Sequence, residues 1–338
     1  GGDVTQPYPK RAKPDVARNM VLSQQKIGEP LKPEDVLHGL KLVNETPGYA
    51  VTATLQPGAK ERETNLMISL EDTPLFNGMA MLDNQGVKAT GAERFVGALN
   101  ANNPSGWGDQ VSLMGLLSEG NNFVRGAYSI GLGYSGLRAG VNATTLNYKL
   151  IGGFSALKAS GNANLYGVTL AYPLAKTNAL NLYANAAADN KRFVNDASDA
   201  NTSDKTFKTL SLSLSGDYLD GLWGGGLNQF SLGMATGRAD LAANATDLAT
   251  DQSTARTQGD YRKLSYNFAR LQKLTDRTGM FLSLSGQLAS RNLDSSEKFT
   301  LGGPNGVRAY PLGEGSGDQG WLLVSELRYN LADNLQLF

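Results

Sequence analysis

A single arginine in a glycine-rich loop is the residue of this chain with the clearest chemical potential. Arg308 lies in the stretch LGGPNGVRAYPLGEGSGDQG, which begins at Leu301 and precedes an alternating strand. Val307 and Tyr310 flank the arginine, although solvent-exposed loops usually carry few large hydrophobic residues. The combination predicts a hairpin loop whose tip folds into the protein interior. The alternative is a loop of a soluble β-protein that leaves Arg308 solvated at a turn.

An arginine brought into a protein interior needs an acidic partner, because an unpaired buried charge is costly. Glu326 is the first candidate and Asp318 the second. The strand after the loop places Glu326 and Arg328 on one face and large apolar side chains on the other. These apolar residues are Trp321, Leu323, Leu327 and Tyr329. Apolar residues on one face and charged residues on the other are typical of a membrane-barrel strand.

The composition argues against several functional classes. Lysine plus arginine equal aspartate plus glutamate at 31 each, which predicts no nucleic-acid partner. The chain has no cysteine and one histidine, His38, so we expect no disulfide framework, metal site or catalytic triad. No apolar run approaches the roughly 20 residues of a membrane-spanning helix. A membrane-crossing form of this chain would therefore have to be a closed β-barrel.

The first part of the chain has mixed α/β character. Helical spacing over residues 14–26 and 34–43 predicts two helices, and proline with acidic residues at the start of the second supports it. Alternation then predicts strands at 49–56 and 64–71, joined by Pro57-Gly58 as a hairpin. We expect a small α/β domain over residues 1–72.

From residue 73 onward the sequence predicts almost only strands. Leu210, Leu212 and Leu214 alternate with serines, and small polar residues suit a wet barrel lumen. We expect short turns on one side and long polar loops at 190–205 and 239–258 on the other. The twelve predicted strands are 75–83, 88–100, 109–118, 123–134, 138–149, 163–172, 179–189, 206–218, 227–238, 259–271, 280–290 and 320–331. A soluble solenoid or propeller is disfavoured because no fixed repeat is visible.

Several motifs in one order resemble the transporters of two-partner secretion, the haemolysin secretion/activation family. The resemblance runs from about Gly28 to the last residue. It rests on Gly28–Leu31, Asn44–Gly48, Leu55–Gly58, Thr64–Leu66, Asp83–Gly86, Thr90-Gly91, Asn103-Pro104, Gly108-Asp109, Gly302-Gly303 and Val307–Tyr310. Each motif alone is weak, and their shared order makes the match specific.

The resemblance implies a mainly β protein: a transmembrane antiparallel barrel preceded by a POTRA domain. Residues 1–72 would be a POTRA-like periplasmic domain, the second of its kind and truncated at its N-terminus. Residues 73–338 would form an outer-membrane barrel with about twelve of sixteen strands, truncated at its C-terminus. The loop would lie inside the barrel and govern opening through Gly302, Gly303, Val307, Arg308, Ala309 and Tyr310. Glycine is common in the family at the position of Ala309.

The resemblance further implies export of a large β-rich exoprotein (a haemolysin, an adhesin or a contact-dependent toxin) from the periplasm of a Gram-negative bacterium. An extended client could add to the strand edge of the POTRA-like hairpin. The predicted contact residues are Tyr49, Val51, Leu55, Leu66 and Ile68. A mere spacer role for the domain is the alternative. An assembly factor that inserts other barrels is the second candidate function, and a passive porin is the third.

One motif points elsewhere and is set aside. Residues 131–136, GLGYSG, match the dinucleotide fingerprint, but the glycines fall within and after a strand with no helix to present amides to phosphate. We expect no enzyme, no nucleotide and no cofactor, with outer-membrane lipid and the exoprotein as partners. Export without ATP would have to be driven by the client folding outside.

Overall fold

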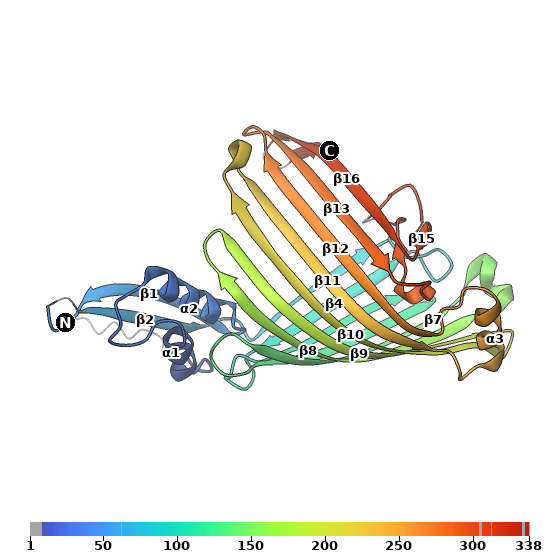
Figure 1. The fold of residues 1–338 in the computed structure, drawn as a ribbon, viewed down its shortest axis with the longest axis horizontal. Helices are drawn as coiled ribbons and strands as arrows, with labels where there is room; N and C mark the ends of the chain where they lie inside the picture. The colour runs from blue at the N-terminus through green and yellow to red at the C-terminus, as the bar shows by residue number, and fades with distance from the viewer. Residues whose placement is uncertain (1–8, 62, 304–305, 312, 333–334, 338) are drawn as a thin grey trace.

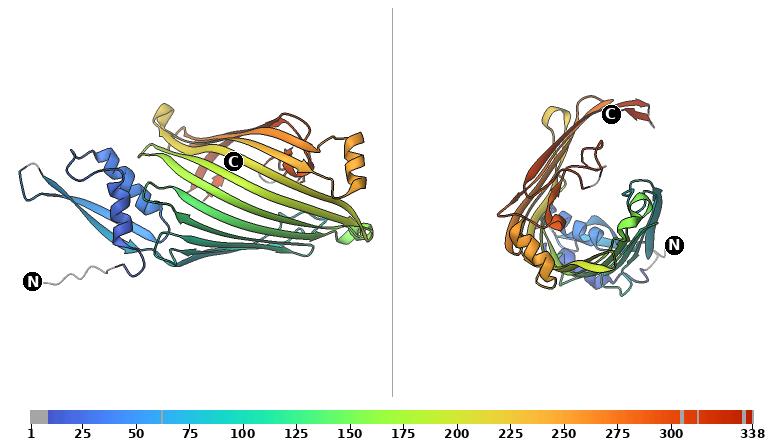
Figure 2. Two further views of the ribbon diagram at one scale, coloured as in Figure 1. Left: turned by 60° about the horizontal axis from the view of Figure 1, so that its bottom comes forward. Right: turned by 90° about the vertical axis from the view of Figure 1, so that its right-hand side faces the viewer.

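The computed structural model describes residues 9–61, 63–303, 306–311, 313–332 and 335–337. A small α/β module lies at one end of a large curved antiparallel sheet, and the long strands run away from it (Figure 1). The sheet bends into a trough, seen end-on in Figure 2. Within the described ranges, every helix is too short or too polar to cross a membrane.

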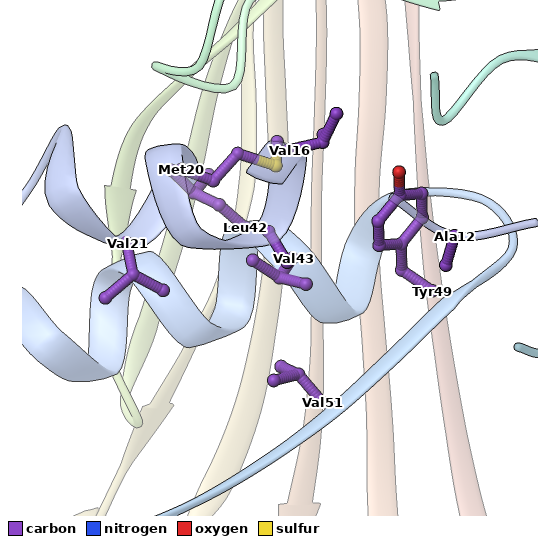
Figure 3. Packing of buried hydrophobic residues seen from close by; sticks show 9 residues of the cluster. Ala12, Val16, Met20, Val21, Leu42, Val43, Tyr49 and Val51 are labelled. Carbon is purple, nitrogen blue, oxygen red and sulfur yellow. The ribbon is translucent and has the colours of Figure 1, made fainter. Parts of the chain in front are cut away.

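The module consists of α1 (Pro14–Leu22), α2 (Pro33–Glu45) and the hairpin of β1 (Tyr49–Pro57) with β2 (Thr64–Asp72). Proline occupies the first turn of both helices, where its missing N–H costs nothing. Apolar residues of the two helices, of β1 and of the segment before α1 form its core (Figure 3). They are Ala12, Val16, Ala17, Met20, Val21, Leu42, Val43, Tyr49 and Val51. The predicted α/β arrangement is confirmed, although α1 ends four residues earlier than expected.

The large sheet has thirteen strands that follow one another in chain order, with β3 and β17 at its two edges. The strands are β3 (Phe76–Asp83), β4 (Arg94–Asn102), β5 (Gln110–Ser118), β6 (Asn121–Gly131), β7 (Arg138–Lys149), β8 (Ser160–Lys176), β9 (Leu180–Ala197), β10 (Ala200–Asp220), β11 (Gly226–Asp240), β12 (Gly259–Lys273), β13 (Thr278–Ala289), β16 (Gly320–Ala332) and β17 (Leu335–Leu337). All twelve predicted strands are present, and three-residue β17 is additional. Every pairing is antiparallel, as a meander of hairpins requires.

The two faces of the sheet differ as the alternation predicts. Leu210, Leu212 and Leu214 are exposed on the convex face of β10, and Trp321 and Leu327 are exposed on that of β16. The intervening serines of β10 face the concave side, where the segment between β13 and β16 lies (Figure 2). An apolar convex face with a polar interior is the pattern of a barrel whose outer surface meets lipid.

The predicted long loop at 190–205 is wrong. These residues continue β9 and β10, which are joined by a tight turn at Ser198 and Asp199, both with positive φ. Two positive-φ residues form the type I′ geometry that suits a hairpin, but they lack the glycine that usually marks it. The polar composition of this segment therefore belongs to two strands and does not mark a loop. The segment 239–258 is a connection as predicted, but it includes a helix, α3 (Ala245–Ser253), capped by Asn244.

The module is docked on the strand turns at its end of the sheet. Arg11 donates hydrogen bonds to the carbonyls of Thr73 and Asn102 at 2.5 and 3.0 Å, and the Tyr49 hydroxyl donates to Gly106 at 2.9 Å. Lys176 of β8, only 1% exposed, donates to Glu45 of α2 at 2.6 Å. These contacts lie at the β4–β5 and β8–β9 turns, and Ser23 donates to the Tyr134 carbonyl of the β6–β7 turn at 3.0 Å.

The glycine-rich stretch 131–136 forms one of these turns, between β6 and β7. Gly136 has φ +88°, and a Cβ there would lie 2.8 Å from Leu42 of α2 and 2.6 Å from Pro173. Glycine is required at this position for the close approach of the module to the barrel as well as for the turn. The motif thus has a structural use in this fold.

Candidate functional site

The loop between β13 and β16 folds back into the trough and is closed by its own backbone. Short strands β14 (Phe299–Thr300) and β15 (Ser316–Gly317) pair at its base. Nearer the tip, Val307 donates to the Leu301 carbonyl at 2.7 Å, and Gly303 donates to the Tyr310 carbonyl at 3.0 Å. These bonds form a compact turn around Arg308.

The two glycines of the motif occupy places that exclude larger residues. A Cβ at Gly302 would lie 2.2 Å from the Pro311 carbonyl oxygen, and Gly303 has φ +116°. Ala309 lies exposed in the turn between Arg308 and Tyr310, where a small residue meets no obstacle. The glycine pair is therefore needed to bring the loop strands together.

Arg308 reaches the wall of the barrel. It donates to Glu326 Oε1 at 2.6 Å, and the second carboxylate oxygen accepts a hydrogen bond from Arg328 at 3.0 Å. The Arg328 guanidinium in turn lies 4.7 Å from the centre of the Phe281 ring. The side chain of Glu326 is 14% exposed and that of Arg308 is 60% exposed. The contact at the tip therefore joins a shielded carboxylate to a largely solvated guanidinium.

The second predicted partner of the arginine, Asp318, is engaged at the base of the loop. It accepts a hydrogen bond from the Leu293 N–H at 2.8 Å and lies 3.6 Å from Lys298. The Asp318 carbonyl also accepts from Gln287 at 3.1 Å. Asp318 thus holds together the two chain segments that enter and leave the loop.

A second ionic network, which the sequence analysis did not identify, fixes the start of the loop to the wall. Glu297, 3% exposed, pairs with Lys191 of β9 and Lys263 of β12, both at 2.7 Å. Asp294, 8% exposed, pairs with Lys205 of β10 at 2.9 Å. These three lysines are spread over more than seventy residues of sequence, so no local spacing could have indicated the network.

Apolar packing lies directly beside these charges. Leu293, next to Asp294 in the chain, is buried against Phe207 and Tyr261 on the concave face. Phe193 meets Phe207 edge-to-face at a centroid distance of 5.7 Å. A dry apolar cluster next to the ion pairs lowers the local dielectric and strengthens them. The start of the loop is therefore anchored, whereas its tip makes a more exposed contact.

The module carries a groove at the predicted client-binding hairpin. It has a volume of about 1160 Å³ and is lined by α1, the α1–α2 connection and β2. Leu66 and Ile68 line it, together with Ile27, Leu31 and Met67, which remain exposed. Leu55 lies exposed on β1 outside this set of lining residues.

Tyr49 and Val51 do not reach this surface. Both are buried in the module core, and the Tyr49 hydroxyl is held by Gly106 of a barrel turn at 2.9 Å. The prediction that they contact a client is therefore corrected. Tyr49 and Val51 lie on the same face of the hairpin as Leu66 and Ile68. At the start of β1, however, α1 and α2 cover this face, and the two side chains are buried beneath them.

Comparisons with known proteins agree with this architecture. The description "Haemolysin secretion/activation protein ShlB/FhaC/HecB" matches residues 62–338. The chain is 32% identical to a heme/hemopexin transporter protein, HuxB, of Haemophilus influenzae, over 86% of this chain and 51% of the relative. It is 25% identical to the outer membrane transporter CdiB of Dickeya dadantii, over 89% of this chain and 54% of that protein. The chain thus spans about half the length of the relatives it matches.

Solved structures match the fold. CdiB from Escherichia coli aligns with a TM-score of 0.77 at 20% identity, covering 94% of this chain and 60% of that one. BamA from Haemophilus ducreyi aligns with a TM-score of 0.54 at 12% identity, covering 90% and 58%.

The family description covers the whole large sheet and the arginine loop, and the fold of a relative extends over nearly the whole chain. The chain therefore belongs to the haemolysin secretion/activation protein family ShlB/FhaC/HecB, the two-partner secretion proteins of the Gram-negative outer membrane.

Proposed function

We propose that this chain is the working part of a transporter that passes a large β-rich exoprotein from the periplasm to the cell surface. The observation that carries the proposal is the arginine loop, anchored at its start and held at its tip inside a curved antiparallel sheet. A loop in this place obstructs the lumen, so its tip must move for a polypeptide to pass. The named relatives include a heme/hemopexin transporter, which makes a haem-linked exoprotein the first client to examine.

We further propose that residues 1–72 act as a POTRA-type periplasmic domain that receives the client, and that residues 73–338 form the barrel. Three contacts support a fixed relation between them: Lys176 with Glu45, Arg11 with Asn102, and Tyr49 with Gly106. Such docking holds the groove of the module near the barrel entrance. An extended client lying in the groove would then be directed toward the lumen.

The gating step is tested with Arg308→Ala in the full-length transporter. The variant should reach the outer membrane in normal amount and lower secretion of the exoprotein at least tenfold. Arg277→Ala is the matched control, because this arginine is exposed at the β12–β13 turn and has no ion pair in the described part of the chain. Normal export by Arg308→Ala would refute a gating role for the tip.

The client path is tested with a photo-activated cross-linker at Met67, which is exposed beside the groove. The cross-linker should trap the exoprotein during export. The same group at Thr52 of β1, an exposed residue outside the groove lining, should trap much less. Equal capture at both positions would favour the spacer role of the module.

A further inference from the structure

A row of polar and charged side chains crosses the convex face of the sheet at the end opposite the α/β module. The strand register places Tyr166, Asn190, Lys208, Arg238 and Asp260 side by side on β8 to β12. All five are exposed. Their neighbours in sequence, among them Lys191, contact the loop inside the trough. Because side chains alternate between faces, this row must lie on the outer surface.

Toward the module, the rows on the same face become apolar. Two residues along each strand, the next row contains Val168, Leu210 and Arg262. The row two residues further along the strands, from β8 to β13, contains only apolar residues, and five of them have large side chains. Those side chains are Leu170, Leu212, Met234, Leu264 and Leu288. Lys208 and Leu212 are thus about 13 Å apart along the strand. The change from apolar to charged marks the level where hydrocarbon gives way to headgroups.

The boundary is hollowed and carries positive charge that remains available. A depression of about 780 Å³ is lined by the apolar Val168 and Leu210 and by Lys208 and Arg238. Lys208 and Arg262 form no ion pair within the described ranges, and Arg238 lies 3.9 Å from an exposed Asp260. Such an exposed, long pair contributes little and leaves the guanidinium free to bind another anion.

Arg192, one row further out, provides the contrast. It forms two hydrogen bonds with the Asp204 carboxylate, at 2.9 and 2.7 Å, so its charge is already matched. Lys208, Arg238 and Arg262 are therefore available charges at the edge of the apolar rows. This position suits an amphiphilic anion and does not suit a purely soluble one.

We infer that Lys208, Arg238 and Arg262 bind the phosphorylated headgroup of an outer-leaflet glycolipid, with its acyl chains along Val168, Leu210 and Leu212. Guanidinium groups match phosphate oxygens in two-point hydrogen bonds, and an ammonium adds a point charge. Basic groups at a membrane surface attract anionic headgroups. The assignment to the outer leaflet uses the orientation proposed above, with the module in the periplasm.

The test uses the full-length transporter purified in detergent and native mass spectrometry. The probe is synthetic bis-phosphorylated lipid A, compared with its dephosphorylated form and with inorganic phosphate as competitor. The variant Lys208→Gln/Arg238→Gln/Arg262→Gln should retain the phosphorylated lipid at least tenfold less than the wild type. The control Lys60→Gln/Lys273→Gln/Arg277→Gln removes the same charge from exposed positions in the module or at its end of the barrel. It should bind as the wild type does.

Three results would overturn the inference: equal retention by the triple variant, equal retention of dephosphorylated lipid, or displacement of the lipid by millimolar inorganic phosphate. If the triple variant fails to fold, the single variant Lys208→Gln replaces it, and Lys208→Arg is the control that preserves the charge. The single glutamine variant should bind less and the arginine variant should bind normally. Because lipid retention is measured without client, its failure would leave the export proposal standing.

Discussion

The start and the tip of the arginine loop are both held by ion pairs, but the pairs at the start are buried and the pair at the tip is exposed. At the start of the loop, Glu297 is 3% exposed and sits between Lys191 and Lys263, beside a dry cluster around Leu293. At the tip, Arg308 is 60% exposed and meets Glu326 from the solvent side. Both are ion pairs with distances below 3 Å. Distance alone therefore says little about how firmly each end is held.

Burial decides the difference. Removing one partner of a shielded pair leaves an uncompensated charge and costs several kcal/mol, whereas an exposed pair contributes about 0–1 kcal/mol. The loop is thus built with a fixed start and a releasable tip. For the proposed gating role, this means that the tip can be released while the base keeps the loop in place.

The largest expected effect comes from breaking the base. Glu297→Gln removes the charge that pairs with two lysines, and we expect the free energy of unfolding to fall by about 3 kcal/mol. Urea unfolding followed by tryptophan fluorescence in detergent micelles measures this change. Glu314→Gln, an exposed position in the same loop, is the control and should change stability by less than about 0.5 kcal/mol. Equal effects of the two variants would show that the base is not an anchor.

Breaking the tip should separate stability from function. For Arg308→Ala we expect a loss of no more than about 1 kcal/mol in the same urea titration, since the pair is exposed. The loss of secretion should nevertheless be at least tenfold. A destabilisation as large as that of Glu297→Gln would contradict the contrast between tip and base.

Double-mutant cycles sharpen the comparison. The coupling energy between Lys263→Gln and Glu297→Gln should exceed about 1.5 kcal/mol, and that between Arg308→Ala and Glu326→Gln should stay below about 1 kcal/mol. Glu326→Gln alone should cost more than Arg308→Ala alone, because it also removes the partner of Arg328 at 3.0 Å. Couplings of equal size at the two ends would argue that burial does not set the difference.

The smallest effect is expected from a tether outside the membrane. Asp72, at the end of the module, accepts hydrogen bonds from the backbone N–H groups of Lys10 and Ala12 at 2.6 and 2.8 Å. Desolvation acts to raise the pKa of Asp72, but these bonds outweigh it and hold the pKa below its ordinary value of 3.8. The carboxylate therefore stabilises the fold above that ordinary value, and the stabilisation is lost as the pH falls through the lowered pKa.

Asp72→Asn should accordingly reduce the acid sensitivity of the module. The wild type should lose stability between about pH 5 and the lowered pKa, and the variant should show a flatter profile over this range. Thermal unfolding monitored by circular dichroism at a series of pH values measures it. Parallel profiles for the two proteins would show that Asp72 does not contribute through its charge.

The local alternation of apolar and polar residues was sufficient to predict most of the fold. Alternation placed every long strand, because a strand between lipid and water must change polarity at each residue. The same rule put Glu326 on the lumen face and so indicated the partner that Arg308 contacts. The pattern failed at 190–205, where the outward face of the hairpin is polar and the inward face carries Lys191 and Lys205, which pair with the loop, so the alternation loses its apolar half. It also failed for Tyr49 and Val51, whose burial depends on two helices that close over them.

The sequence by itself thus determined the strands, their faces, the loop glycines and the arginine pair, since each follows from residues near one another in the chain. Only the tertiary structure decided how the loop is anchored, how the module docks and where available charge gathers on the outer face. Glu297 meets Lys191 over 106 residues, and Lys176 meets Glu45 over 131. Such pairs depend on the curvature of the sheet and on the register of many successive hairpins. Local sequence periodicity does not predict either over such distances.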